Sequence, residues 1–234
     1  LVGLHTHIGA QIMSPQPYVQ ALEKLTDLAV LAMFVTGCEA GELNLGGGFP
    51  ICWSEEDDPP QVAPLLYAIA QNMRMMCERK GMSAPCVSVE PGRAIVAEAG
   101  TLVTRVYAVK RTEGFRPYAA LDVRAPRAVD PAYANRSPVF LLANRPNDQD
   151  EEIFALADRT GDPDGILAWE AYLPEVHAGD LIAQLSAGAV PWPERGPGSP
   201  AVLIAQYGHA TPIVQRPDAQ YFARLDVVPS RLNR

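Results

Sequence analysis

The sequence of 234 residues contains no apolar run that approaches the roughly 20 residues needed to cross a bilayer. It has no basic stripe to contact nucleic-acid phosphates, and its formal net charge is -8. Its start, Leu1-Val2-Gly3-Leu4-His5, has neither an initiator Met nor the basic region and cleavage site of a signal peptide. We therefore expect no membrane or nucleic-acid partner, and we expect a fragment that opens inside a strand.

Cysteine is scarce, and the cysteines that are present show no C-x-x-C spacing. In a chain of this length, such cysteines predict neither a disulfide framework nor a zinc site. We expect free thiols, buried or partly buried, in a reducing cytoplasm. The four residues are Cys38, Cys52, Cys77 and Cys86.

The chain has 48% hydrophobic and 20% charged residues, the usual balance of a soluble globular protein. Its first part alternates short apolar runs with longer segments of helical spacing. Strands are predicted at residues 2–8, 43–45 and 86–89, and helices over 18–32 and 62–77. Ser14 is the expected cap of the first helix. This β-α-β-α-β order predicts parallel strands joined by crossover helices.

Each of these three strands ends in a polar or glycine-rich motif. The motifs are His5-Thr6-His7, Gly46-Gly47-Gly48 and Glu90-Pro91-Gly92-Arg93. The carboxyl ends of barrel strands form the face where (β/α) barrels place their active sites. Three strands cannot close a barrel, so we expect its earlier strands to lie outside this chain.

The glycine run after Leu45 is the motif around which the others are arranged. Three successive free N–H groups form a concave site for an anion such as phosphate. The alternative is a flexible turn between a strand and a helix.

Two other features contain residue types that can bind a metal ion. His5 and His7 point to the same side of a strand, but the sequence supplies no further ligand set, and both residues are equally consistent with structural roles. The acidic residues 55–58 are typical of a solvated loop. We therefore expect no metal.

Together the motifs Gly3–Gln11, Leu45–Pro50 and Glu90–Arg93 resemble the fold-type III, alanine-racemase-like decarboxylases that use pyridoxal 5'-phosphate. Within that family, the likeness is strongest to the diaminopimelate decarboxylases and weaker to the ornithine and arginine decarboxylases. The resemblance is clear to about Lys110 and fainter beyond it.

The resemblance implies a role for each matching position. His7 would lie against the face of the pyridoxal ring. Gly46, Gly47 and Gly48 would give backbone N–H groups to the phosphate, with Gly92 and Arg93 beside it. Glu90 would pair with the pyridine nitrogen as the catalytic carboxylate. The alternative for Glu90 is a surface ion pair with Arg93.

The first part of the chain also departs from the family pattern. Ala10 stands where the family usually has Ser, so one phosphate hydroxyl is lost. The lysine that attaches the cofactor belongs near the first barrel strand, outside this chain. The three lysines that are present, Lys24, Lys80 and Lys110, are not convincing substitutes.

The second part reads as a succession of strands and turns, which predicts an all-β domain. Strands are expected at 101–110, 118–123, 139–143, 180–185, 201–206 and 210–214, with a loop at 191–200. The predicted fold class is α/β plus all-β: the C-terminal part of a (β/α)8 TIM-like barrel, followed by a β-barrel or sandwich domain. The predicted domains are residues 1–105, a partial pyridoxal-phosphate-binding barrel, and 106–234, the C-terminal β domain.

In this second part, several of the family's functional residues are replaced by other residue types. The family's Cys-Glu-Ser-Gly-Asp motif should fall near Thr160–Leu167, where this chain has no cysteine. Val190 stands where the family has an aromatic residue. Asp130 stands where a carboxylate-binding Arg is expected. An acid at that position repels a carboxylate and suits an amine, so ordinary meso-diaminopimelate is not the expected substrate.

The resemblance therefore implies a pyridoxal-phosphate-dependent amino-acid decarboxylase. It also implies a homodimer, because in the family the residues at these replaced positions normally serve the site of the partner subunit. Two alternatives stay open: a non-catalytic relative that acts as a regulatory or binding subunit, and an activity of the alanine-racemase type.

Overall fold

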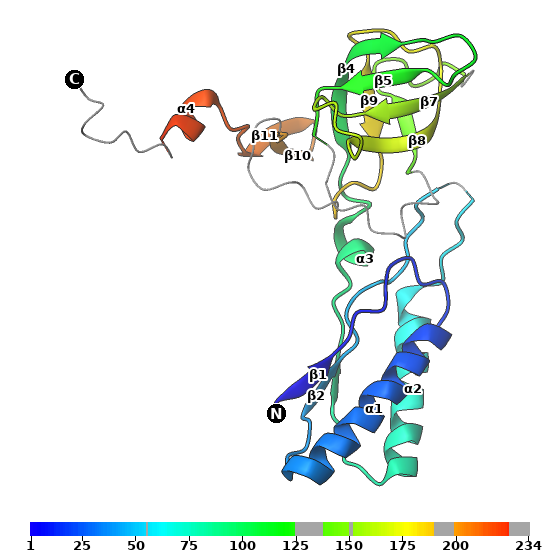
Figure 1. Ribbon diagram of the computed structural model, residues 1–234, viewed down its shortest axis with the longest axis vertical. Coiled ribbons are helices and arrows are strands. Elements are labelled where there is room, and N and C mark those ends of the chain that lie inside the picture. The colour runs from blue at the N-terminus through cyan, green and yellow to red at the C-terminus, as the bar shows by residue number, and fades with distance from the viewer. Residues whose placement is uncertain (55, 125–137, 150–151, 190–198, 225–234) are drawn as a thin grey trace, which may run out of the picture. The chain divides into compact units, whose positions relative to one another are not determined.

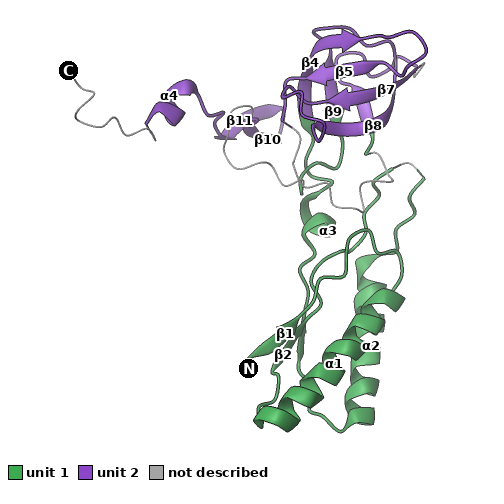
Figure 2. Ribbon diagram, viewed as in Figure 1, with its two compact units in different colours: residues 1–102, 129–139, 184–189 green, residues 103–128, 140–183, 190–234 purple. Residues whose placement is uncertain are grey.

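The structure is a computed structural model that describes residues 1–54, 56–124, 138–149, 152–189 and 199–224. It divides into two compact units (Figure 2). The first comprises residues 1–102, 129–139 and 184–189, and the second comprises residues 103–128, 140–183 and 190–234. The main break lies at residue 102, and two later segments return to the first unit.

The first unit alternates strands and helices, as the sequence predicts. Its elements are β1 (Gly3–His5), α1 (Gln16–Thr36), β2 (Glu42–Asn44), α2 (Val62–Lys80), β3 (Cys86–Ser88) and α3 (Gly92–Val96). The strands form a parallel sheet in the order β1-β2-β3, with Leu4 opposite Leu43 and Leu43 opposite Val87. The predicted parallel β-α-β-α-β order is therefore confirmed, although each strand has only three hydrogen-bonded residues.

Helices α1 and α2 lie side by side (Figure 1) and bury one apolar stripe each. The stripes have the i, i+3, i+4 spacing of an amphipathic helix. Their buried residues pack in one cluster with the apolar residues around β2: Tyr18, Leu22, Leu25, Ala29, Leu43, Leu45, Leu65, Ile69, Met73 and Met76. Met73 and Met76 thus fill the core, whereas Met75 is exposed.

The ends of α1 follow local backbone rules. Its N-cap is Pro15, without a side-chain cap, so the prediction of Ser14 as the cap is wrong. Its C-cap is Gly37, whose φ of 71° is the left-handed conformation that glycine adopts readily.

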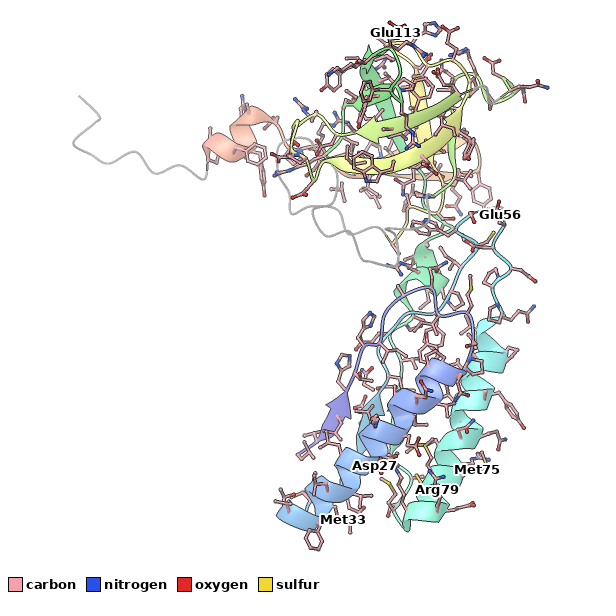
Figure 3. The ribbon with its side chains drawn as sticks, turned by 45° about the vertical axis from the view of Figure 1, so that its right-hand side comes forward. Asp27, Met33, Glu56, Met75, Arg79 and Glu113 are labelled. Carbon is pink, nitrogen blue, oxygen red and sulfur yellow. The ribbon has the colours of Figure 1, made fainter. Side chains whose placement is uncertain are left out.

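Charged groups join α1 to the end of α2. The Lys80 ammonium lies 2.7 Å from Asp27 Oδ1 and donates to the Thr26 hydroxyl at 2.6 Å. Arg79 pairs with Glu23 at 3.2 Å. Figure 3 labels Asp27 and Arg79 on these neighbouring helices. Because α2 ends here and leads into the start of β3, the cluster lies opposite the carboxyl ends of the strands.

The second unit is built mainly of strands, as predicted. A six-stranded sheet has the order β6-β9-β4-β5-β7-β8. Its strands are β4 (Leu102–Lys110), β5 (Tyr118–Leu121), β6 (Phe140–Leu142), β7 (Glu152–Ala157), β8 (Ile166–Leu173) and β9 (Leu181–Gln184). A separate antiparallel pair, β10 (Val202–Gln206) and β11 (His209–Val214), precedes the short helix α4 (Ala219–Ala223). Strands β7 and β8 were not predicted from the sequence.

The cysteines are all free thiols, as predicted. Only Cys77 is buried, however, and Cys38, Cys52 and Cys86 are exposed, so the expectation that the thiols are buried or partly buried is wrong for three of them. Among the described helices, none combines the length and apolar character that a membrane crossing requires.

Candidate functional site

The glycine run lies between the loops that follow β1 and β3, and the close approach of these loops requires glycine. A Cβ on Gly46, whose φ is +67°, would lie 2.6 Å from the carbonyl oxygen of Thr6. A Cβ on Gly47 would lie 2.5 Å from the carbonyl oxygen of Glu90. Such distances are shorter than side-chain atoms tolerate, so any larger residue would push the three loops apart.

The N–H groups of the run have different partners. The Gly46 N–H donates to Asn44 Oδ1 at 2.7 Å, and the Gly47 N–H donates to His7 Nδ1 at 3.2 Å. The Gly48 N–H has no hydrogen-bond partner among the residues that the structure describes. The prediction of three free donors is therefore wrong for Gly46 and Gly47.

The carbonyl groups of the run are also fixed. The backbone N–H groups of Glu90 and Ile12 donate to Gly46 and Gly48 at 2.8 and 3.0 Å. The Tyr18 hydroxyl donates to the Gly47 carbonyl at 3.1 Å. Contacts from three segments determine the loop, which excludes the flexible-turn alternative.

Tyr18 reaches the glycine run from the first turns of α1. Its side chain is fully buried, and its ring stacks on Phe49 at 5.1 Å between centroids. Burial raises the pKa of the Tyr18 hydroxyl well above its ordinary value, so the group stays protonated and keeps its donor role.

Glu90 follows β3 and turns its carboxylate toward the ends of β1 and β2. Its Oε1 accepts a hydrogen bond from Asn44 Nδ2 at 2.9 Å and lies 3.6 Å from His5 Nε2. The side chains of Glu90 and His5 are each about half exposed. Oε2 has no partner among the described residues, so one carboxylate oxygen is available to a ligand.

His7 lies at the edge of the glycine run, where the Gly47 N–H holds its ring. Because Nδ1 accepts that hydrogen bond, the proton of the neutral ring is on Nε2. The structure thus brings together His7, the glycine run and Glu90, three of the features that the sequence singled out.

Gly92 and Arg93 begin the short helix α3. The Gly92 N–H donates to the Glu90 carbonyl at 2.9 Å. Arg93 lines a hollow of about 220 Å³ together with residues such as Pro50, Ile51 and Pro60. His7, Gly46–Gly48 and Glu90 are not among the described residues that line this hollow. Arg93 therefore follows the site closely in sequence but lines a separate hollow.

Sequence reasoning missed the roles of two amide side chains. Gln11, at φ +53°, donates to the Ile51 carbonyl at 2.9 Å and accepts from the Ile51 N–H at 3.1 Å. Asn44 bonds both Gly46 and Glu90. A signal for Asn44 was present, because a polar residue between the apolar Leu43 and Leu45 needs hydrogen-bond partners if it is buried.

Several other positions that the sequence singled out are not among the described residues of this site. Asp130, Val190 and Glu55 lie outside the described residues. Near the position expected for the family's cysteine motif, the structure has a tight turn: Asp158 accepts from the Thr160 N–H at 2.8 Å and from the Thr160 hydroxyl at 2.6 Å. Within the described ranges, no three His, Cys, Asp or Glu residues are arranged to hold a metal ion.

None of the three lysines lies on the loops that follow β1, β2 and β3. Lys24 is on α1, and Lys80 is bound to Asp27 and Thr26 at the far end of α2. Lys110 ends β4 in the second unit.

The chemistry of the gathered groups fits a ligand that combines an anion with a protonated ring nitrogen. The Gly48 N–H is a free donor at a loop where the backbones already lie too close for a side chain. Glu90 supplies a free acceptor oxygen on an anionic group, and His7 offers a flat ring held by the Gly47 N–H. Pyridoxal phosphate carries the complementary groups, since it has an anionic phosphate and an aromatic ring with a basic nitrogen.

Comparison with known proteins gives the same class. Residues 1–97 match the family model described as the pyridoxal-binding domain of the pyridoxal-dependent decarboxylases. The resemblance to the fold-type III pyridoxal-phosphate-dependent decarboxylases is thereby confirmed, and it covers the β1–α3 region in which the site lies.

The curated proteins that match this chain carry a more specific name than the family model does. The chain is 30% identical over 235 residues to diaminopimelate decarboxylase of Methanothermobacter thermautotrophicus, covering 99% of this chain and 54% of the relative. It is 31% identical to the enzyme of Halalkalibacterium halodurans, over 97% of this chain and 53% of the relative. The chain thus spans about half the length of the curated relatives it matches.

A solved structure shares the fold. The diaminopimelate decarboxylase of M. jannaschii, crystallised with L-lysine, superposes with a TM-score of 0.77 at 24% identity. The match covers 99% of this chain and 53% of that chain.

Proposed function

We propose that residues 1–97 bind pyridoxal 5'-phosphate and that the protein containing them is an amino-acid decarboxylase of the diaminopimelate decarboxylase type. The observation that carries the proposal is the convergence of Gly48, His7 and Glu90 at the carboxyl ends of three parallel strands. Each of these residues supplies one kind of contact that the cofactor needs.

When bound, pyridoxal phosphate accepts the electron pair that remains after carbon dioxide leaves the substrate. The Glu90 carboxylate holds a proton on the ring nitrogen through its free Oε2. The His7 ring, fixed by the Gly47 N–H, covers one ring face. The Gly48 N–H would hold the phosphate, and the family resemblance assigns Gly92 and Arg93 to the same group.

The same proposal extends to the architecture. The first unit is the later part of a (β/α)8 barrel, residues 1–105 are the cofactor domain, and residues 106–234 are the β-barrel or sandwich domain. The parallel sheet with its crossover helices and the six-stranded sheet support this assignment. We also propose a cytoplasmic homodimer, with which the free thiols are compatible.

The proposed substrates are amino acids. The curated relatives are named for diaminopimelate, but Asp130 stands where the family's carboxylate-binding Arg is expected, so we expect a basic amino acid to be preferred. A panel of amino acids with the complete, cofactor-loaded protein tests this by carbon dioxide release. Diaminopimelate as the best substrate by a wide margin would contradict the Asp130 argument, and no release from any amino acid would contradict the decarboxylase proposal.

A non-catalytic, cofactor-binding relative is the second candidate. It is favoured by the closed turn at Asp158–Thr160, which stands where the family's cysteine motif is expected. In that case the complete protein would bind pyridoxal phosphate stoichiometrically and yet release no carbon dioxide from any member of the panel.

A further inference from the structure

We propose that Asn44 is a positioning residue that couples the phosphate-binding loop to the ring-binding carboxylate. This inference rests on the proposed function, because it assigns Asn44 a task at the same site. Its side-chain amide uses both ends: Oδ1 accepts the Gly46 N–H at 2.7 Å, and Nδ2 donates to Glu90 Oε1 at 2.9 Å. One planar group thus fixes the distance between the two halves of the site.

The contact also determines which oxygen of Glu90 is available. Oε1 is occupied by Asn44 and has His5 Nε2 at 3.6 Å. Oε2 has no partner among the residues described, so it is the oxygen that Asn44 leaves for the ring nitrogen. Because the Glu90 side chain is about half exposed, it would otherwise sample several rotamers, and the Asn44 bond selects one.

An asparagine is required because the two neighbours need opposite partners. Gly46 presents a donor and Glu90 an acceptor, so the bridging group must accept at one end and donate at the other. An aspartate in place of Asn44 would still accept from Gly46. It would also place a second carboxylate against Oε1, and like charges at this separation repel.

The side-chain task of Asn44 is separate from its backbone task. Its carbonyl accepts the Thr6 N–H at 2.9 Å and continues the pairing of β1 with β2. That bond does not depend on the side chain, so a substitution at this position tests the amide without removing the strand.

The test compares Asn44→Ala and Asn44→Asp in the complete protein, with Asn72→Ala as the control. Asn72 is an asparagine on α2 whose amide donates to the Ala68 carbonyl at 2.8 Å, within its own helix. Two quantities are measured: amide hydrogen exchange of Gly46 in cofactor-free protein labelled with ¹⁵N-glycine, and the Kd for pyridoxal phosphate from absorbance titration.

We expect Asn44→Ala to speed Gly46 exchange and to raise the Kd, each by about ten-fold, since one hydrogen bond is lost on each side. Asn44→Asp should keep the slow Gly46 exchange but raise the Kd at least as much, because only the Glu90 contact fails. Asn72→Ala should change neither quantity. Wild-type exchange and Kd in Asn44→Ala, or fast Gly46 exchange in Asn44→Asp, would overturn the inference.

The two measurements separate this inference from the proposed function. If the wild-type protein does not bind pyridoxal phosphate, the proposed function fails, and the coupling of Asn44 to a cofactor site fails with it. If the wild type binds the cofactor and Asn44→Ala binds it equally well, the proposed function stands and only the role of Asn44 is wrong.

Discussion

At the scale of single residues, each group of the site has one atom bonded within the protein and another atom available to a ligand. Glu90 is bonded through Oε1 and open at Oε2. In the glycine run, the Gly46 and Gly47 N–H groups are hydrogen-bonded within the protein, whereas the Gly48 N–H has no partner among the described residues. A ligand therefore meets preorganised groups, which lowers the entropic cost of binding.

Glu90→Gln separates the electronic role of this residue from its role in binding. The amide keeps the size of the side chain but cannot hold a proton on the ring nitrogen. We expect the complete protein still to bind pyridoxal phosphate and, at saturating cofactor, to lose turnover by about 100-fold or more. Glu78→Gln, on an exposed turn of α2, is the control. Normal carbon dioxide release from the Glu90 variant would refute the pairing.

Arg93→Ala tests the charge assigned to the phosphate. Loss of a charge-assisted hydrogen bond should weaken binding of pyridoxal phosphate by about ten-fold or more. Pyridoxal, which lacks the phosphate, should bind the wild type and the variant alike, and Arg74→Ala on α2 should have no effect. Because Arg93 lines a hollow apart from the other site residues, an unchanged Kd for the phosphate form would assign this arginine to that hollow instead.

At the scale of elements, the turn into β9 depends on Asp180, which is largely buried. Its carboxylate accepts from Asn144 at 3.0 Å, from Arg145 at 2.8 Å and from the His177 N–H at 2.8 Å. Burial raises the pKa of Asp180, but these hydrogen bonds and the Arg145 charge outweigh it and hold the pKa below its ordinary value. The ionised form is therefore the one that stabilises the fold.

Asp180→Asn should lower the free energy of unfolding by about 2 kcal/mol at pH 7, since Arg145 loses its buried partner. A depressed folded-state pKa contributes stability that is complete above the unfolded value near 3.9 and is lost as the pH falls through the folded value. Urea unfolding should therefore show the difference between wild type and variant at pH 7 and a smaller one near pH 3. Asp148→Asn, which removes a more exposed partner of Arg145, should cost less than about 1 kcal/mol. An equal difference at both pH values would rule out the ionised Asp180 as the cause.

The elements that sequence predicted well are those with a clear period. The stripes of α1 and α2 and the alternation of β4 follow from it. Strand β7 was missed because Phe154, Ala155 and Leu156 are all buried, so no alternation marks it. The glycine run was found from its residue types alone. The Gly47 N–H, however, donates to His7, 40 residues away in sequence, and the Gly46 carbonyl accepts from the Glu90 N–H of a third segment, and no local pattern encodes such contacts.

At the scale of the whole molecule, none of the three lysines is on a loop that follows a strand of the parallel sheet. Lys80 is bonded at the end of α2 opposite the carboxyl ends of the strands, and Lys110 belongs to the second unit. We expect residues 1–234, expressed by themselves, to release no carbon dioxide from amino acids and to retain no pyridoxal phosphate after borohydride treatment and denaturation. Covalent retention of the cofactor by this chain would show that one of its lysines reaches the site.

The most direct test of the central claim maps where the cofactor binds. Hydrogen–deuterium exchange of the complete protein should be measured with and without pyridoxal phosphate, and with pyridoxal as the phosphate-free control. We predict that the peptides spanning residues 43–51 and 86–97 become protected by pyridoxal phosphate and less so by pyridoxal, because Gly48 and the Glu90–Arg93 turn contact the ligand. Tight binding with unchanged exchange in both peptides would contradict the account, because the cofactor would then be bound elsewhere.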